Sequence, residues 1–257
     1  MNVAMTTDDL TKLTTSALVA GQAIMKIYQG AFAFEQKADH SPVTQADVAA
    51  EDIILQDLAK NFPTIPVVSE EQHAEGIPVV TGDTFFLVDP LDGTREFISR
   101  NGEFTVNIAL IHLGLPIMGV VYAPATGEIF TGFVGSVAQK AKVPTLEFSL
   151  IRARARPPAG PCVVASRSHL DAETQNYIAT QNPASINNAG SSLKFCRLAE
   201  GVADLYPRFG RTMEWDTAAG HAVLLAAGGR LTKPDGSPFT YGKAGFENGP
   251  FIAMGAF

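Results

Sequence analysis

The sequence predicts a layered mixture of helices and sheets, with an antiparallel first half and an α/β second half. Three observations support this fold class. Apolar residues with helical spacing run from about residue 7 to 28, three apolar segments separated by short turns fill residues 104–134, and strand-like and helix-like segments alternate after residue 161. The 257 residues, 46% of them hydrophobic, are enough to bury a sizeable core.

The first half is expected to begin with two helices. The first, about residues 7–28, has apolar residues spaced by three and four, the repeat of one helix face: Leu10, Leu13, Ala17, Ala20, Ile24 and Ile27. A second helix is expected at about 45–61, with Val48, Leu55 and Leu58 among its apolar positions, and Phe62-Pro63 ends it. Asp47 falls in its first turn, where position alone indicates a complement to the helix dipole.

Two short apolar runs that end in acidic residues follow. IPVVSEEQ ends in Glu70 and Glu71, and FFLVDPLDG ends in Asp89 and Asp92. The stretch 104–134 then contains FTVNIALIHL, PIMGVVYAP and EIFTGFV, which LG and ATG turns separate. We expect these three segments to pair as an antiparallel meander.

The segment 149–161 is rich in Arg, Ala and Pro and is the best domain boundary in the chain. It predicts an N-terminal α+β subdomain over 1–150 and a C-terminal α/β subdomain over 151–257. In the second subdomain PCVVAS is expected to be a strand, and three helices should follow. They are DAETQNYIATQ with Asp171 at its start, SSLKFCRLAEG with Gly201 past its end, and DTAAGHAVLLAAGG, which opens on Asp216 and closes at Gly228-Gly229.

Composition argues against several classes of function. With 26 acidic and 19 basic residues the net charge is -7, which is unsuited to binding a nucleic-acid backbone. The one basic cluster, RARAR at 152–156, precedes PPAGP and is interpreted as a linker or strand edge. Cys162 and Cys196 match no zinc-binding or disulfide pattern and are expected to be reduced and buried. Without a signal peptide or an unbroken apolar span, the chain is expected to be a soluble cytoplasmic protein with no integral membrane segment.

Asp89 and Asp92 pose an electrostatic problem at the end of a buried run. Two carboxylates about 4 Å apart repel by roughly 4 kcal/mol at an effective dielectric of 20. A shared proton or a divalent cation would cancel that repulsion. Glu70 and Glu71 could supply further oxygens, and a set of carboxyl oxygens without His or Cys suits Mg²⁺ rather than zinc.

The residues after Asp92 suit an anion. Gly93 lets the backbone approach a ligand closely, and REFISRN could start a short helix whose free N–H groups point at that ligand. Metal ions on one side of a ligand and unbonded backbone N–H groups on the other would together form a phosphate-binding site. The alternative is an ordinary turn with Thr94 as the N-cap of the helix.

Together these motifs carry a resemblance. Asp47, Glu70-Glu71, DPLDGT at 89–94 and WDTAA at 215–219 occur in the order of the lithium-sensitive, magnesium-dependent phosphatase superfamily, which includes inositol monophosphatase and fructose-1,6-bisphosphatase. Over essentially the whole chain, VDPLDGTREFISRNGEFTVNIALI, ASRSH, GSSLKFC, LYPRFG and WDTAAGHAV resemble CysQ-type 3'(2'),5'-bisphosphate nucleotidases. The resemblance implies a layered αβαβα sandwich of the inositol monophosphatase type and inhibition by lithium.

The resemblance also implies a role for each motif residue. Two or three Mg²⁺ ions would be held by Glu70, Asp89, Asp92, Asp216 and the backbone carbonyl of Leu91. Gly93 and Thr94 would donate to the phosphate being cleaved. Thr94 with Asp47 would orient and activate the attacking water, and Glu71 would share that work. Asp47 thus becomes a candidate catalytic residue as well as a dipole complement, and Asp216 can both start its helix and bind metal.

The substrate must be inferred from residues outside the metal site. Arg208 stands where inositol monophosphatases carry an acidic residue, which favours a second anionic group on the substrate. Further expected substrate-binding residues are Ser166, His169, Gly190, Ser192 and Lys194. The substrate implied by resemblance is 3'-phosphoadenosine 5'-phosphate, a by-product of sulfate assimilation, which would be cleaved to AMP and phosphate.

Several residues keep an alternative interpretation. Lys194 and His169 could be solvated helix residues, and Arg208 could pair with Glu214 or Asp204. For Trp215, the only tryptophan, packing inside the protein is favoured over stacking on the substrate. Asn248 is a weak candidate for ligand contact, and Glu103 could either help build the metal loop or lie on the surface. No role is assigned to His40, His73, His112 or His221.

Two other functions compete with this interpretation. One is an inositol or sugar phosphate phosphatase of the same superfamily. The other is a non-catalytic phosphate-binding protein, which should have lost at least one of Asp47, Glu70, Asp89, Asp92, Thr94 and Asp216, although all six are present. Relatives of this kind occur as monomers and dimers, so a homodimer stays open. Peripheral attachment to the cytoplasmic face of a membrane follows from resemblance alone, because no lipidation motif or basic amphipathic helix supports it.

Overall fold

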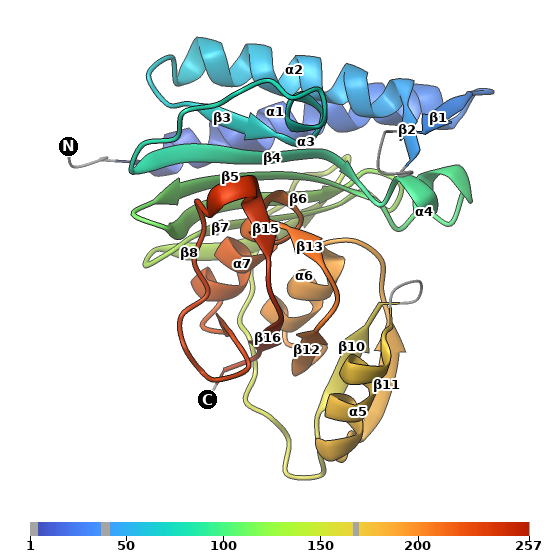
Figure 1. The fold of residues 1–257 in the computed structure, drawn as a ribbon, viewed down its shortest axis with the longest axis vertical. Helices are drawn as coiled ribbons and strands as arrows, with labels where there is room; N and C mark the ends of the chain where they lie inside the picture. The colour runs from blue at the N-terminus through green and yellow to red at the C-terminus, as the bar shows by residue number, and fades with distance from the viewer. Residues whose placement is uncertain (1–4, 37–41, 167–169, 257) are drawn as a thin grey trace.

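The computed structural model describes residues 5–36, 42–166 and 170–256, and these residues form five layers (Figure 1). Helices α1 (Thr7–Tyr28) and α2 (Gln45–Asn61) cover the outer face of a seven-stranded sheet. Helices α6 (Leu193–Ala199) and α7 (Glu214–Ala226) separate this sheet from a five-stranded one, and α5 (Ala172–Thr180) lies against the far side of the second sheet. The expected αβαβα sandwich is therefore confirmed. None of the helices within the described ranges has the length and apolar character needed to cross a bilayer.

The two outer helices begin and end where the sequence predicts. Thr6 caps α1, because its side chain accepts from the Asp9 N–H and its own N–H donates to the Asp9 carboxylate. The expected apolar face of α1 is buried against the sheet, apart from the partly exposed Ile27. In α2 the small residues Ala46 and Ala50 are fully buried, whereas Val48, which was expected among the apolar positions of the helix, is 51% exposed. Helix α2 packs on both α1 and β4, and Asp47 in its first turn is buried.

The seven-stranded sheet contains the predicted meander. Its strand order is β3-β4-β5-β6-β7-β8-β9, with β3 parallel to β4 and every later pair antiparallel. Leu113 and Gly114 both have positive φ, as a two-residue hairpin turn with the favoured twist requires. The strands are β3 (Val67–Ser69), β4 (Thr84–Asp92), β5 (Thr105–His112), β6 (Leu115–Ala123), β7 (Glu128–Phe133), β8 (Val137–Lys142) and β9 (Ser149–Leu150).

Helix α7 packs directly on the inner face of this sheet. A Cβ at Gly119 of β6 would lie 2.7 Å from the Ala222 side chain, and one at Gly132 of β7 would lie 2.6 Å from Val223 Cα. The helix starts at Glu214, two residues earlier than expected, so Asp216 lies in its first turn rather than at its opening. The Asp216 carboxylate accepts the Met213 N–H at 2.8 Å, which explains why the helix can begin there.

The five-stranded sheet has the order β11-β10-β12-β16-β14. β10 runs parallel to both neighbours, and β12, β16 and β14 are successively antiparallel. Asp171 caps α5 as predicted, accepting from the Thr174 N–H at 2.8 Å. The strands are β10 (Cys162–Ala165), β11 (Ser185–Asn188), β12 (Leu205–Arg208), β14 (Arg230–Thr232) and β16 (Phe251–Met254).

Short elements complete the fold at the edges of the layers. β1 (Phe34–Gln36) pairs with β2 (Pro42–Thr44), and β13 (Thr212–Met213) pairs with β15 (Glu247–Asn248). The one-turn helices α3 (Glu70–Ala74) and α4 (Thr94–Ile98) directly follow β3 and the turn after β4, and the 3₁₀ helix η1 (Ala244–Phe246) precedes β15. Glu70 and Glu71 therefore begin α3, and Asp89 and Asp92 lie at the end of β4, shortly before α4.

The segment between the sheets is used structurally. Arg154 donates to Asp204 at 2.7 and 3.0 Å, and Arg156 donates to the Gln181 carbonyl at 2.7 Å. The strands of the first sheet precede residue 151 and those of the second follow residue 161. Because α7 of the second half packs on the first sheet, the division into 1–150 and 151–257 stays a prediction.

One expectation about the cysteines is wrong. Both are free thiols, and Cys196 is buried, which raises the pKa of its thiol well above the usual value. Cys162 is partly exposed rather than buried, because it begins β10 where that strand emerges from the connecting segment. Its Sγ lies 3.3 Å from the Asn187 side-chain amide.

Candidate active site

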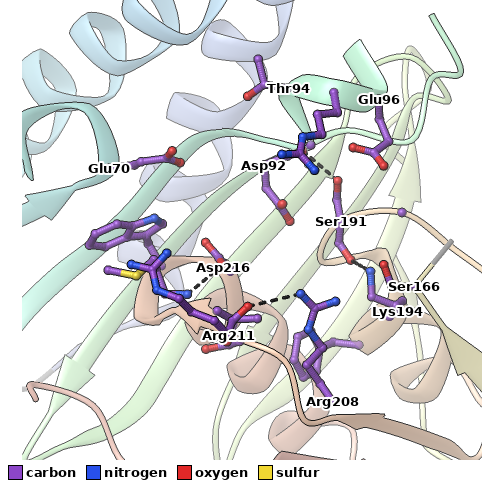
Figure 2. Close-up of a pocket in the computed structure, with 18 of the residues that line it drawn as sticks. Glu70, Asp92, Thr94, Glu96, Ser166, Ser191, Lys194, Arg208, Arg211 and Asp216 are labelled. Carbon is purple, nitrogen blue, oxygen red and sulfur yellow. Dashed lines mark hydrogen bonds between the residues drawn. The ribbon is translucent and has the colours of Figure 1, made fainter. Parts of the chain in front are cut away.

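A cavity of about 310 Å³ lies where the end of β4 meets α6 and α7, and residues of both halves line it (Figure 2). One group of lining side chains is acidic and another is basic. The acidic residues are Glu70, Asp92, Glu96 and Asp216, and the basic residues are Arg95, Lys194, Arg208 and Arg211. The cavity therefore presents both acidic and basic side chains to a ligand.

Three carboxylates from three different elements face the same part of this cavity (Figure 2). Glu70 begins α3 immediately after β3, and Asp92 ends β4. Because β3 and β4 are parallel neighbours, their carboxyl ends meet at one edge of the sheet. Asp216 joins them from the first turn of α7, which packs under that sheet. The predicted convergence of these acidic residues is present.

Burial makes these charges costly. It raises the pKa of Asp92 to about 6, with Lys194 opposing the rise and Glu96 and Glu70 adding to it. It also raises the pKa of Asp216 well above the usual range, and repulsion from Asp92 and Glu70 adds to that rise. A group of buried hard-oxygen donors that raise one another's pKa is suited to a divalent cation. Over the described ranges, no three His, Cys, Asp or Glu side chains are already gathered closely enough to hold one.

Asp89 is not among the residues that line the cavity, but it lies in β4 three residues before Asp92, which is. It is 1% exposed, and its carboxylate accepts the Leu91 N–H at 3.1 Å. Directly across the β4–β5 ladder is Asn107, which is equally buried and whose Nδ2 has no bonding partner among the described residues. An unsatisfied donor buried beside a buried carboxylate fits a site that a bound ion and its water would complete. Glu70, Asp89, Asp92, Asp216 and the Leu91 carbonyl thus remain suitable as the predicted metal ligands.

Asp47 closes the cap of α2 and also contacts Thr94, a residue that lines the cavity. Its Oδ2 accepts the N–H of Thr44 at 2.8 Å and the Thr44 hydroxyl at 2.6 Å, which closes the capping box of α2. Its Oδ1 accepts the Thr94 hydroxyl at 3.1 Å. Burial raises the pKa of Asp47, although the bonds from Thr44 oppose that rise. The two interpretations from the sequence are therefore compatible.

Gly93 supplies a backbone conformation that few residues adopt. Its φ of 94° is left-handed, and it precedes α4, so Thr94 is the first helical residue rather than the N-cap. A Cβ at this position would collide with Ser191 Oγ and lie 3.2 Å from the Glu103 carbonyl oxygen. We expected Gly93 to let a ligand approach the backbone closely. In the structure, Ser191 and the Glu103 carbonyl already approach it closely.

The loop of residues 190–192 joins the two halves. Ser191 Oγ lies 2.7 Å from the Asp92 carbonyl and 2.8 Å from the Glu103 carbonyl. Ser192 Oγ lies 3.1 Å from Asp92 Oδ2 and 2.8 Å from the Asp216 carbonyl. Each serine oxygen therefore lies within hydrogen-bonding distance of two oxygens that belong to other elements. This loop fixes the end of β4 against the start of α7.

The expected substrate-binding residues occupy different positions. Ser166 and Gly190 line the cavity, and a Cβ at Gly190 would lie 2.6 Å from the Glu103 carbonyl oxygen. Ser192 is 1% exposed, and its hydroxyl lies near Asp92 Oδ2 and the Asp216 carbonyl. His169 lies outside the described residues. Substrate contact by these residues stays a prediction.

Lys194 is not a solvated helix residue. It is 5% exposed, it lines the cavity, and its ammonium donates to the carbonyls of Ala189 at 3.2 Å and Ser191 at 2.7 Å. The ammonium also lies 5.3 Å from the centre of the Tyr206 ring. Burial lowers the pKa of Lys194 to about 8, although Asp92 opposes that change. Lys194 therefore holds the 190–192 loop from inside.

Arg208 braces the chain that follows it. Its Nε donates to the Gly210 carbonyl at 3.4 Å and its Nη2 donates to the Arg211 carbonyl at 3.2 Å (Figure 2). The partners suggested as alternatives have other bonds, since Asp204 accepts from Arg154 and Glu214 pairs with Lys243 at 2.6 Å. The guanidinium of Arg208 lines the cavity, as a substrate-binding role requires.

Glu71 and Glu51 form a buried pair that the sequence did not reveal. Glu71 is 7% exposed, and its N–H donates to Glu51 Oε1 at 3.0 Å. Glu51 also accepts the Gln72 N–H at 3.4 Å, so it stabilises the start of α3. Burial raises the pKa of Glu51. Glu51 is one of several acidic residues in α2, and no motif distinguishes it. A catalytic role for Glu71 stays a prediction.

The remaining aromatic and polar candidates have structural contacts. Trp215 is 4% exposed and packs on His73 with ring centres 5.1 Å apart, but it also lines the cavity, so the choice of packing over substrate stacking stays a prediction. Asn248 is 3% exposed and donates to the Met213 carbonyl at 2.6 Å, joining β15 to the start of α7. His221 bonds Tyr241 at 2.9 Å and His112 bonds Thr84 at 2.8 Å. His40 lies outside the described residues.

Comparison with known proteins gives one consistent result. Residues 7–252 match the profile of the inositol monophosphatase family. A 3'(2'),5'-bisphosphate nucleotidase CysQ of Escherichia coli O157:H7 is 50% identical over 224 residues, which cover 86% of this chain and 89% of that protein. The CysQ nucleotidase of Buchnera aphidicola is 41% identical over 95% of this chain and 92% of its own length.

Solved structures agree with the sequence relatives. CysQ from Bacteroides thetaiotaomicron, described as a bacterial member of the inositol monophosphatase family, has a TM-score of 0.82 and 38% identity, covering 97% of this chain and 98% of that one. An inositol monophosphatase from Zymomonas mobilis has a TM-score of 0.79 at 24% identity, covering 97% and 93% of the two chains, and shows likeness of fold alone. The matched range 7–252 includes every residue that lines the cavity.

Proposed function

The chain belongs to the inositol monophosphatase family of phosphoric monoester hydrolases, and from this premise we propose that it hydrolyses 3'-phosphoadenosine 5'-phosphate to AMP and phosphate. The observation that carries the proposal is the presence of acidic and basic side chains in one cavity. Glu70, Asp92 and Asp216 face one part, while Lys194, Arg208 and Arg211 also line it. A substrate with two phosphates can present one to the acidic residues through metal and the other to the basic ones.

Mg²⁺ fits the acidic part of the cavity. The ligands would be Glu70, Asp89, Asp92, Asp216 and the Leu91 carbonyl, and two or three ions would balance charges whose burial raises the pKa of Asp92 and Asp216. Bound ions would neutralise charge on the phosphate and on the departing alkoxide, and they would lower the pKa of a bound water. The raised pKa values and the unsatisfied amide of Asn107 support this assignment.

The protein's own residues would position the reacting groups. Gly93 and Thr94 open α4, so their N–H groups can donate to the phosphate oxygens. The Thr94 hydroxyl, bonded to Asp47 Oδ1, is placed to accept a bond from the attacking water and pass its proton to Asp47. Burial raises the pKa of Asp47, which makes its carboxylate a better proton acceptor than an exposed aspartate. Glu71 would assist from the adjoining helix.

The CysQ relatives support the nucleotide over an inositol phosphate. Those relatives are named bisphosphate nucleotidases at up to 50% identity. In this chain Arg208, in the position where the resemblance leads one to expect an acidic residue in inositol phosphatases, lines the cavity. A guanidinium there favours an anionic group over sugar hydroxyls.

The test is phosphate release with Mg²⁺ from three substrates, each with and without lithium. They are 3'-phosphoadenosine 5'-phosphate, inositol 1-phosphate and fructose 1,6-bisphosphate. We expect the nucleotide to be preferred by at least about 10²-fold in kcat/KM and lithium to suppress its cleavage. Preference for inositol phosphate would overturn the substrate assignment and keep the metal site, and no release with Mg²⁺ or Mn²⁺ would overturn the catalytic assignment. Cytoplasmic location and the oligomeric state stay predictions.

A further inference from the structure

Arg211 is a cationic residue of the cavity that the motifs did not single out. It follows Gly210 in the turn between β12 and β13 and lines the cavity. Its Nε lies 2.9 Å from Glu247 Oε2, and the two side chains are 62% and 56% exposed. The β13–β15 pairing places Glu247 opposite Met213, so the two-stranded sheet holds the carboxylate close to the arginine. Arg211 thus stands at the rim with a partner that water screens.

Two of the other cations of the cavity, Lys194 and Arg208, differ from Arg211 in how they are held. Lys194 is buried and donates to two carbonyls of its own loop. Arg208 donates to the carbonyls of Gly210 and Arg211, and so it fixes the backbone that presents Arg211. An exposed Arg–carboxylate pair contributes little to stability, because water already solvates both charges. A doubly charged phosphate could replace Glu247 on Arg211 with little loss.

We infer that Arg211 determines specificity for the second phosphate of the substrate, with Glu247 as the competing anion that occupies it when no such substrate is bound. This inference rests on the proposed function. Arg211 lies five positions before Asp216, and β13 and the first turn of α7 connect them. The separation between the metal-facing phosphate and the arginine-bound phosphate is therefore set by a short, regular piece of chain. A monophosphate would gain nothing from Arg211.

The test compares 3'-phosphoadenosine 5'-phosphate with 3'-AMP, which lacks only the second phosphate. The variants are Arg211→Gln, Arg211→Lys and Glu247→Gln. The control is Arg156→Gln, which changes another exposed arginine, one bonded to Gln181 and absent from the lining of the cavity. For Arg211→Gln we expect kcat/KM on the bisphosphate to fall about 10- to 100-fold, through KM, and on 3'-AMP to stay within about twofold. Arg211→Lys should recover part of the loss.

Glu247→Gln gives the opposite and more specific signal. Removal of the competing charge should lower KM for the bisphosphate about two- to fivefold and leave 3'-AMP unchanged. Equal loss on both substrates in Arg211→Gln, or no loss on either, would overturn the inference while the proposed function stands. A wild-type protein that fails to cleave the bisphosphate would overturn the proposed function and this inference with it. Activity on 3'-AMP shows that each variant is folded.

Discussion

The hydroxyl of Thr94 donates to the carboxylate of Asp47 at 3.1 Å, although the two residues belong to different helices and lie 47 positions apart. Asp47 is oriented by Thr44 on its other oxygen, and Thr94 is fixed as the first residue of α4. The Thr94 hydroxyl also lies 3.4 Å from the Leu91 carbonyl oxygen, so Asp47 is the nearer of its two acceptors. The proton route from an attacking water to a buried carboxylate, which we propose above, depends on this pair.

Thr94→Val keeps the shape of the side chain and removes the hydroxyl. We expect kcat to fall about 10²- to 10³-fold because the proton route is lost, with KM changed little. Thr94→Ser should recover activity to within about tenfold. Thr145→Val, which removes an exposed hydroxyl bonded to the Lys142 carbonyl, is the matched control. Steady-state kinetics on the preferred substrate measure this, and a Thr94→Val enzyme with normal kcat would contradict the assignment.

Asp89→Asn should separate folding from catalysis. The buried carboxylate becomes neutral, so we expect an unchanged or higher Tm in the absence of metal and at least about 10³-fold lower kcat with Mg²⁺. Isothermal titration should also show weaker Mg²⁺ binding. Asp235→Asn, at an exposed turn where the carboxylate accepts the Ser237 N–H, is the control for a lost negative charge. Activity of Asp89→Asn within tenfold of wild type would remove Asp89 from the ligand set.

Gly93→Ala tests the contact between the two halves. We expect a loss of about 1–3 kcal/mol in the free energy of unfolding, from the left-handed φ and from the collision with Ser191 Oγ. Ser191→Ala in the same chain should restore only the part that the collision causes, which urea denaturation of the double-mutant cycle measures. Gly82→Ala, where no atom lies within 4 Å of a new Cβ, should be close to neutral. An additive cycle would show that position 93 is limited by backbone strain alone.

The stability of the metal-free protein should fall as pH rises. Burial raises the folded-state pKa of Asp92 to about 6 from its ordinary value of 3.8, and that of Asp216 moves in the same direction. The folded protein then holds a proton that the unfolded chain has released. This stabilisation is fully present below pH 3.8 and is lost as pH rises through about 6.

Between pH 4.5 and 7.5 we expect these groups to lower the free energy of unfolding by about 1–2 kcal/mol in EDTA, and Mg²⁺ to reverse the loss at pH 7.5. Urea denaturation at both pH values measures it. Asp92→Asn should show a smaller pH dependence than wild type. An equal pH dependence in the two proteins would show that Asp92 ionises in the fold without cost.

Local patterns predicted much of the fold. The stripe from Leu10 to Ile27 predicted a helix over about 7–28, and the LG turn predicted the hairpin between β5 and β6, where both turn residues have positive φ. Both signals come from neighbours along the chain, where periodicity and turn chemistry decide. The start of α7 was placed two residues late, because its first turn is closed by the Asp216 carboxylate rather than by a typical cap residue.

The sequence identified several residues of the site but not the contacts that hold them together. Asp47, Glu70, Asp92 and Asp216 carry motifs, and three of them face one cavity. The contacts that hold them do not carry motifs. Ser191 meets Asp92 across 99 positions, and Glu51 meets Glu71 across 20. The burial of Lys194 could not be predicted from the sequence, because a lysine in a short helix ordinarily points to water.

The 190–192 loop has a consequence for how the molecule assembles. Its two serines touch Asp92 and Asp216 only after the first sheet, α7 and the second sheet have met, since the contacts span 99, 100 and 24 positions. Each sheet can acquire its secondary structure before that encounter, but the cavity cannot exist before it. During refolding, recovered turnover should therefore lag behind recovered circular dichroism, and the interval between the two signals measures the docking of the halves.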